Sequence, residues 1–563
     1  MFDNLDLQAI PDENARQLIR KLLNLIEQLS ADLRDAQAEN QRLRDEINRL
    51  KGEQGKPQFK AQKPEAPAPA TDHSSEKERR KPRQRHKKSK QAEIQIDREE
   101  VLEVPREDLP ADAEFKGYER VVVQDIVIKT DNVCFHKEKF YSASTQQSYQ
   151  AELPRGYDGQ YGPGVKALVP ALYFGMGSSE PKILEFLVNA GIQISAGQVS
   201  NFVIKEQDEF HAEKDAVCEA GLRSSPWQHT DDTKTQVDGE NQHCHVLCNP
   251  AYTIYHTLPH KDRLSVLDVL RNGRERRFCL NQMALDLLEQ APLSKKVRLA
   301  LQTWRSDTVM PETIFDTSLL RWLPAMGEMQ RKYIRDAAAI AAYHLESDWP
   351  VIETLVCDDA PQFNWLTRSL ALCWVHEGRP YKKLIPVVPQ HRALLDGFLG
   401  DFWKYYDKLL DFQERFKSTG QCSNDERTAL EAEFDTLFAT TTGYDQLDQR
   451  IARTRAKKAS LLMVLRHPEI PLHNNPAELG VRQRVRKRDV SFGPRTQDGR
   501  RAWDTFMSLA ETCKKVGVSF YAYLRNRMSG SNAIPHLAEL VTKTARELNL
   551  GRSWSAASPS PSY

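Results

Sequence analysis

Residues 351–363 read Val-Ile-Glu-Thr-Leu-Val-Cys-Asp-Asp-Ala-Pro-Gln-Phe, and this stretch decides the fold. An apolar run that ends at Cys357 is followed at once by two carboxylates, Asp358 and Asp359. A near-continuous apolar run is typical of a strand that is buried on both faces of a sheet. Ligands and metal ions bind at the ends of such strands in α/β folds. The stretch alone also fits a strand followed by an Asp-initiated turn.

A second pair of carboxylates lies upstream in a strand-like run. Residues 227–235 contain Asp231 and Asp232, and Asp238-Gly239 then predicts a hairpin turn. Residues 243–248 and 252–258 read as the next two strands, and a helix is expected from Asp262 to Leu270. The histidines and cysteines of 243–248 predict no zinc site, because alternate residues of a strand point to opposite faces.

A third acid, Glu478, lies in the run Ile470-Pro-Leu-His-Asn-Asn-Pro-Ala-Glu-Leu-Gly480. Asn475 as the N-cap and Pro476 as the first helical residue make Glu478 the third, which is close to a capping box. Glu478 therefore also has a purely structural interpretation. A basic run follows, and we expect it to contact DNA phosphates through Arg482, Arg484, Arg486, Lys487 and Arg488.

The order of these segments predicts an α/β catalytic core of the RNase H-like class. A strand that carries Asp231 or Asp232, a hairpin, a helix, a strand that ends at Asp358 or Asp359, and a later helix with Glu478 follow in that order. Phosphodiester cleavage in a core of this class needs carboxylates from separate elements to converge on two divalent cations about 3.5–4 Å apart. Oxygen ligands suit Mg²⁺ or Mn²⁺, and we expect two ions per site and no zinc.

Several ordered blocks resemble the insertion-sequence-66 transposase family, over roughly residues 150–530. The blocks are His229–Thr233, Cys357–Phe363, Cys373-Trp-Val-His376, Pro471–Glu478, Leu153–Gly159 and a final block from Ser508 to Leu524. The resemblance implies that Asp231, Asp358 and Glu478 are the catalytic and metal-binding residues of a DDE-type enzyme, which cuts and joins DNA ends. It favours Asp358 over Asp359, which is expected to point aside and cap the turn. Small companion proteins of the element are further partners that the resemblance implies.

Three features depart from that family. The family usually has a zinc ribbon after its coiled coil, and here Cys134 remains alone, so a zinc ribbon is not expected. Leu479 follows Glu478 where the family commonly has Arg. The interval of 127 residues from Asp231 to Asp358 implies a helical insertion near 281–350. None of these departures removes a carboxylate, so an active enzyme is expected.

The N-terminal segment, residues 1–51, predicts a coiled coil that forms a homodimer. Five heptads place Ile or Leu at most a and d positions, and Asn40 at one a position fixes the register. The residues expected at the dimer contact are Leu22, Ile26, Leu29, Leu33, Asn40, Leu43, Ile47 and Leu50. A higher oligomer is expected when two DNA ends are held together.

Residues 52–100 predict a basic disordered linker, although the chain as a whole carries a net charge of only +1. Its basic run suits DNA phosphates, and it equally fits a merely soluble linker. The DNA-contact candidates are Arg79, Arg80, Lys81, Arg83, Arg85, Lys87 and Lys88.

The other segments complete the expected organisation. Residues 101–153 predict a small β-rich region, which includes the β-branched run 118–129. Residues 154–215 predict helices, of which 181–190 and 196–204 fit a DNA-binding helix-turn-helix or any helical hairpin. The catalytic domain is expected over 216–530, with helical insertions near 281–350 and 391–467, and a C-terminal tail over 531–563.

Cysteine usage and hydropathy predict a cytoplasmic protein, and the family resemblance implies a bacterial one located at the nucleoid. The nine cysteines are irregularly spaced, which favours a reducing compartment, and neither a signal peptide nor a membrane-spanning run is expected. Two functions compete with a DNA transposase: an RNase H-like nuclease without strand transfer, and an inactive DNA-binding regulator derived from a transposase.

Overall fold

The structure is a computed structural model, and it describes residues 10–51, 94–105, 109–110 and 113–555. The centre is a five-stranded mixed sheet with the strand order β5-β4-β3-β8-β9. β3 (Trp227–Val237), β4 (Glu240–Asn249) and β5 (Tyr252–Leu258) form an antiparallel meander, as the sequence predicts. β8 (Thr354–Cys357) and β9 (Ser369–Leu372) extend the other side of β3 as parallel strands. The α/β class is confirmed.

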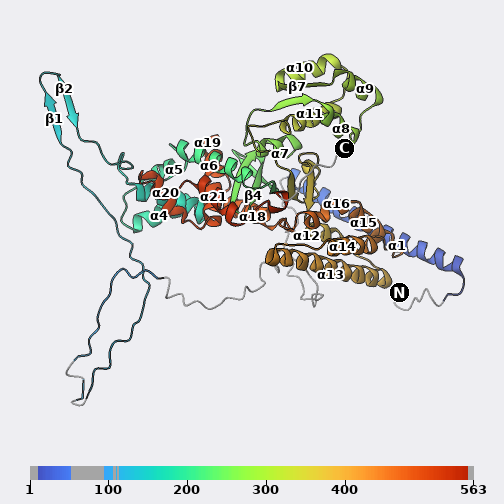
Figure 1. The fold of residues 1–563 in the computed structure, drawn as a ribbon, viewed down its shortest axis with the longest axis horizontal. Helices are drawn as coiled ribbons and strands as arrows, with labels where there is room; N and C mark the ends of the chain where they lie inside the picture. The colour runs from blue at the N-terminus through green and yellow to red at the C-terminus, as the bar shows by residue number, and fades with distance from the viewer. Residues whose placement is uncertain (1–9, 52–93, 106–108, 111–112, 556–563) are drawn as a thin grey trace.

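The opening stretch is the buried strand that its composition predicts. All four residues of β8 are buried, because β3 and β9 flank it. After β5 the chain forms a separate lobe (Figure 1) and returns as β8. β8 pairs with β3, so β3 and β8 both lie in the interior of the sheet. Residues at the carboxyl end of β8 therefore lie between β3 and the edge strand β9.

Helix α19 (Gln497–Lys515) covers the free edge of β5 with side-chain hydrogen bonds. Thr512, Ser508 and Asp504, spaced four residues apart on one helical face, accept from the backbone N–H groups of Thr253, Tyr255 and Thr257. An unpaired strand edge would otherwise be a template for aggregation. This edge helix is preceded in the chain by α18 (Asn475–Ser491), which lies across β3 and β4.

The segment between β5 and β8 forms a lobe that the sequence predicts only in part. Its helices are α7 (Arg263–Leu270), α8 (Gln282–Glu289), α9 (Lys295–Trp304), α10 (Glu312–Trp322) and α11 (Glu328–Tyr343). A two-stranded sheet of β6 (Arg277–Leu280) and β7 (Ser306–Pro311) was not predicted. β6 is short and β7 is largely exposed, so neither has a strong strand signature.

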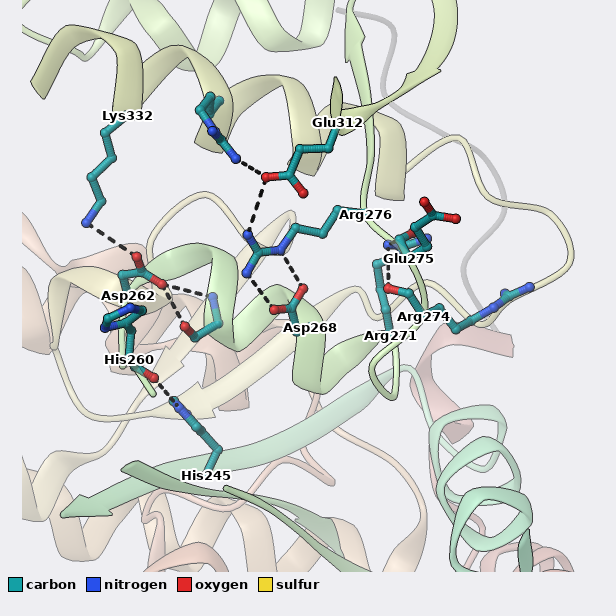
Figure 2. Close-up of polar contacts among 12 residues, drawn as sticks. His245, His260, Asp262, Asp268, Arg271, Arg274, Glu275, Arg276, Glu312 and Lys332 are labelled. Atoms are coloured by element: carbon teal, nitrogen blue, oxygen red, sulfur yellow. Dashed lines mark hydrogen bonds and ion pairs between the residues drawn. The ribbon is translucent and has the colours of Figure 1, made fainter. Parts of the chain in front are cut away.

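Figure 2 shows the polar contacts that hold this lobe to the sheet. Arg276 pairs with Asp268 of α7 at 2.6 Å and reaches Glu312 of α10 at 4.0 Å. The ring of His245, on β4, lies 3.1 Å from the backbone oxygen of His260, at the entry to the lobe. These contacts join α7, β6 and α10 into one unit beside the five-stranded sheet.

A second helical insertion follows β9 and α12 (Trp374–Lys382). It contains α13 (Pro389–Thr419), α14 (Asn424–Leu437), α15 (Asp445–Ala456) and the short α16 (Lys458–Leu461) and α17 (Met463–Arg466). These bounds agree with the helices predicted over 391–467. Its core is aromatic, and the buried Trp374 is packed among Phe402, Tyr405 and Phe434.

The N-terminal helix α1 (Glu13–Leu50) docks on this insertion through a face that the heptad does not use. The buried Glu27 carboxylate accepts from the backbone N–H groups of Val387 and Val388, the latter at 2.8 Å, where α13 begins. A carboxylate at a helix N-terminus is stabilised by the free N–H groups there. The heptad residues Leu22, Leu29 and Leu33 stay exposed.

Two segments differ from their predictions. The run 118–129 forms no strand, because no neighbouring strand pairs with it, and its residues Val123 and Ile126 are exposed. The β-structure of this region is instead a hairpin of β1 (Lys139–Ser142) and β2 (Gln147–Gln150). The predicted C-terminal tail contains α21 (Leu537–Glu547), which buries Leu537 and Val541 against α6 (Asp208–Arg223).

The helices before α6 lie close to their predicted bounds. They are α3 (Pro163–Pro170), which continues into the π-helical turn η3 (Ala171–Gly175), then α4 (Glu180–Asn189) and α5 (Ala196–Ile204). Ser195 caps α5 by accepting from the backbone N–H of Gln198, as expected. Across the described part of the chain, each helix is too short or too polar to span a membrane.

Candidate active site

The parallel pairing of β3 and β8 brings Asp231 and Asp358 together. His229 lies opposite Val356, and Asp231 and Asp358 each follow two residues later in these parallel segments, Asp358 just beyond the end of β8. Directly opposed residues of neighbouring strands lie on one face of a sheet. The negative charge of Asp358 also contributes to the raised pKa of Asp231, as expected for two carboxylates that lie near each other.

Helix α18 brings Glu478 to the same face. Asp231 is paired with Val246, and Val246 with Tyr255, so these three side chains form a row across β3, β4 and β5. α18 crosses this row at Gly480, where a Cβ atom would lie only 2.9 Å from Cγ1 of Val246. Tyr255 donates its hydroxyl to the backbone oxygen of Gly480 at 2.9 Å. Glycine therefore lets the helix approach the sheet closely enough for Glu478 to face Asp231.

The predicted capping box at the start of α18 is wrong by one residue. Asn474 is the N-cap, and the backbone N–H of Glu478 donates to the Asn474 oxygen at 3.1 Å, so Glu478 is the fourth helical residue and not the third. The shift arises because the Asn474 side chain binds β3 and caps nothing. The Glu478 carboxylate thus has no capping role and is left to the site.

Asn474 anchors the start of α18 on β3. Its amide nitrogen donates to the backbone oxygen of Thr230 at 2.8 Å, and its amide oxygen lies 2.9 Å from Nδ1 of His229. Its backbone N–H donates to the Cys373 sulfur at 3.3 Å. Asn474 and His229 are fully buried. This asparagine therefore ties β3, α12 and α18 together directly beside Asp231.

Burial and neighbouring acids make Asp231 an unusually weak acid. Burial, together with the charges of Asp358, Asp232 and Glu478, raises the pKa of Asp231 to about 7, against the backbone N–H of Asp232, which favours the ionised form. A divalent cation would neutralise the negative charge that gathers around Asp231. The donor set, three carboxylates, is that of a hard cation such as Mg²⁺ or Mn²⁺.

The acids next to Asp231 and Asp358 are engaged elsewhere. Asp232 accepts from the Gln362 side chain at 3.0 Å, and it pairs with His245 across the strands, on the sheet face that Asp231 does not use. Asp359 forms an ion pair with Lys457 at 2.7 Å, so it points aside as expected. It does not cap the turn, however: Asp358 itself accepts the Ala360 N–H at 3.1 Å.

Two cationic or titratable groups of α12 hold the Glu478 carboxylate. Nδ1 of His376 lies 3.5 Å from Oε1, and the Arg379 guanidinium lies 3.6 Å from Oε2. The His, Cys, Asp and Glu side chains of the described residues are possible metal ligands. Among them, Cys373, His376 and Glu478 are the one group of three whose ligand atoms all lie within 4.8 Å of one another. Asp231 and Asp358 are not part of this set.

Only part of the predicted basic run of α18 is open to solvent. Arg484 is buried, stacks on Trp503 at 4.7 Å and pairs with Asp504 at 3.4 Å. Lys487 is also buried, 3.1 Å from the centre of the Tyr173 ring, and burial lowers its pKa to about 7. The structure therefore assigns Arg484 and Lys487 to packing and not to a DNA-facing surface.

The other predicted DNA contacts remain predictions. Arg486 is exposed, Arg482 is half-buried, and Arg488 is half-buried and donates to the backbone oxygen of Lys234. The seven basic residues predicted in the linker lie outside the described residues.

Sequence reasoning missed three residues that shape the site. Asn474, His376 and Arg379 were not chosen, because none is an acid and their partners are distant in the chain. The sequence does carry a signal for two of them: the doubled asparagine Asn474-Asn475, and the Cys-x-x-His spacing of Cys373 and His376.

Comparison with known proteins gives the context of this site. The family model described as "Transposase IS66 family" matches residues 335–502, a range that contains Asp358, Cys373, His376 and Glu478. An uncharacterized protein of Sinorhizobium fredii, y4jO, is 31% identical over 335 residues, which are 58% of this chain and 99% of that protein. No solved structure matches the chain.

Proposed function

The chain belongs to the transposase IS66 family, and on that premise we propose that it is a DNA transposase which cleaves insertion-sequence ends and joins them to target DNA. The observation that supports this most is the convergence of Asp231, Asp358 and Glu478 from β3, β8 and α18 on one face of the sheet. The strand order β5-β4-β3-β8-β9 supports an RNase H-like core, in which the two central strands carry the acids.

The residues of this chain fit two divalent cations. Asp231, Asp358 and Glu478 would hold the ions, because the charges of Asp358 and Glu478 both act on Asp231. The Glu478 Oε1 atom is buried and without a hydrogen-bond donor, which leaves it open to a cation. When bound, Mg²⁺ or Mn²⁺ would activate a water molecule or a 3′-hydroxyl and stabilise the leaving oxygen of the phosphodiester.

The protein side chains supply position and charge. Asn474 fixes the start of α18, so that Glu478 keeps its place relative to Asp231. His376 and Arg379 orient the Glu478 carboxylate from α12. The exposed Arg486 lies two turns beyond Glu478 on α18, where it is placed to contact the phosphate backbone of a bound DNA end. α4 and α5 are the candidate helix-turn-helix that reads the end.

The N-terminal helix supports a dimeric enzyme. α1 is a single helix over Glu13–Leu50. Its heptad residues Leu22, Leu29 and Leu33 are exposed, while Glu27, on the neighbouring face, is bound to the start of α13. A stripe of exposed leucines with a and d spacing is what a parallel coiled-coil partner covers. A second copy of this chain is the proposed partner.

The test uses purified full-length protein, labelled element-end DNA, a target plasmid and Mg²⁺. Joined products support a transposase, nicked products alone would indicate a nuclease, and DNA binding without products would indicate a regulator. The Asp358→Asn variant is expected to lose all chemistry and to keep DNA binding. The Asp359→Asn variant is the matched control and is expected to keep joining, because Asp359 is turned toward Lys457.

A further inference from the structure

The Cys373-x-x-His376 block lies at the candidate active site, where His376 contacts Glu478 and the Cys373 thiol has no role in the proposed chemistry. Cys373 is the residue immediately before α12, and His376 is in the first turn of that helix. Both side chains face the start of α18, where Glu478 is located. Cysteine sulfur, imidazole nitrogen and carboxylate oxygen thus come together from two helices.

The atoms that meet there lack donors. Nδ1 of His376 and Oε1 of Glu478 are buried, are 3.5 Å apart, and neither has a hydrogen-bond partner. Two unsatisfied polar atoms that face each other in a buried position are costly unless a proton or a cation lies between them. The Cys373 sulfur is buried within 4.8 Å of both groups. The space between the three atoms therefore favours a cation.

We propose that Cys373, His376 and Glu478 form a second metal site, which binds Zn²⁺ and thereby withholds Glu478 from the Mg²⁺-dependent chemistry. Thiolate and imidazole ligands select zinc over the hard cations that carboxylates alone prefer. Three protein ligands leave a fourth position of a tetrahedral ion to water. The binding stands on the geometry of these residues, whereas the inhibition rests on the proposed function.

The surrounding contacts suit such a site. The backbone N–H of Asn474 points at the Cys373 sulfur at 3.3 Å and orients it, as outer contacts of metal ligands do. Arg379 engages Oε2 of Glu478 and leaves Oε1 for the ion. Binding replaces the thiol proton of Cys373, which is released to solvent, and no atom is oxidised or reduced.

This site also revises the expectation that zinc plays no part. Cys373 and His376 were not considered with Glu478, because about a hundred residues separate them in the chain. Only the packing of α12 against α18 creates the third ligand. The earlier zinc candidates, such as Cys134 with the exposed His136, offer no third ligand of this kind in the described residues.

Binding is tested without DNA, on the full-length protein freed of metal by a chelator. Co²⁺ is titrated as a spectroscopic probe, followed by Zn²⁺ in competition. The wild type is expected to bind one Co²⁺ per chain with a thiolate-to-cobalt charge-transfer band. The Cys373→Ser variant is expected to lack the band and to bind at least about tenfold more weakly. The control is Cys513→Ser, a buried cysteine in α19, which is expected to match the wild type.

A wild-type protein without the band, or a Cys373→Ser variant that binds as the wild type does, would overturn the proposal. If Cys373→Ser does not fold by circular dichroism, His376→Gln decides the matter, and an undiminished Co²⁺ affinity of that variant would also overturn it. The inhibition is measured as the ratio of Mg²⁺-dependent joining with and without Zn²⁺ in each variant. Zn²⁺ is expected to suppress joining in the wild type and less in Cys373→Ser. An absence of joining even without Zn²⁺ would refute the proposed function and leave the Co²⁺ result standing.

Discussion

Replacing Asp231 by asparagine is expected to make the metal-free protein more stable while it removes the chemistry. In the folded protein, burial raises the pKa of Asp231 to about 7, whereas the ordinary value is 3.8. The folded state thus holds the proton more tightly than the unfolded state does. Stability from this group is complete below pH 4 and is lost as the pH rises toward 7.

The size of the stability change follows from the shift in the pKa of Asp231. Each pKa unit corresponds to about 1.4 kcal/mol, so the ionised carboxylate costs up to about 4 kcal/mol at pH 8. Asparagine keeps the shape and carries no charge. The variant is therefore expected to gain stability over the wild type, with a difference that grows by about 3 kcal/mol between pH 5 and pH 8.

The assay is urea denaturation in the presence of a chelator, followed by tryptophan fluorescence, at both pH values. Mg²⁺ is then added, and it should stabilise the wild type and not the variant, because a ligand stabilises only the state that binds it. Asp359→Asn is the control and should change stability by less than about 1 kcal/mol, since its ion pair with Lys457 is half-exposed. A variant no more stable than the wild type at pH 8, or an equal gain at both pH values, would refute this reasoning.

Four further substitutions test other parts of the structure. Arg486→Ala should weaken DNA binding and lower the salt dependence of the binding constant by about one phosphate contact. The control Arg484→Met replaces a buried arginine, so it should alter stability and leave that salt dependence unchanged. Filter binding over a salt series distinguishes the two variants. Glu27→Ala should free α1 from α13 at a cost of about 1–3 kcal/mol, seen as faster proteolysis of α1 with the mass of the dimer unchanged; loss of the dimer would contradict separate docking and heptad faces. Asn474→Ala should lower joining activity and stability together, by about 1–3 kcal/mol in unfolding, and an unaltered rate would mean that the start of α18 is held by other contacts.

The strands and helices of the core were predictable because their patterns are local. The apolar run of β8, the hairpin at Asp238-Gly239 and the long helices of the second insertion all carry their signal in consecutive residues. The run 118–129 shows the limit of this approach. It has the composition of a strand, yet a strand forms only where a second strand offers hydrogen bonds, and here none does.

The site was predictable in its acids but not in their surroundings. The doubled carboxylates could be separated only by the resemblance, because a choice between neighbours depends on which sheet face α18 covers. The burial of Arg484 and Lys487 was unexpected for a related reason. A basic helix is usually solvated, and only the packing against Trp503 and Tyr173 shows that two of its cations are interior.

The central claim is that Asp231, Asp358 and Glu478 hold two divalent cations for DNA cleavage and joining. The most direct test is anomalous scattering from crystals of the protein bound to an element end and soaked with Mn²⁺. We expect two manganese peaks about 3.5–4 Å apart, in contact with Asp231, Asp358 and Glu478. Manganese bound elsewhere, or no ion in contact with these three carboxylates, would contradict the account.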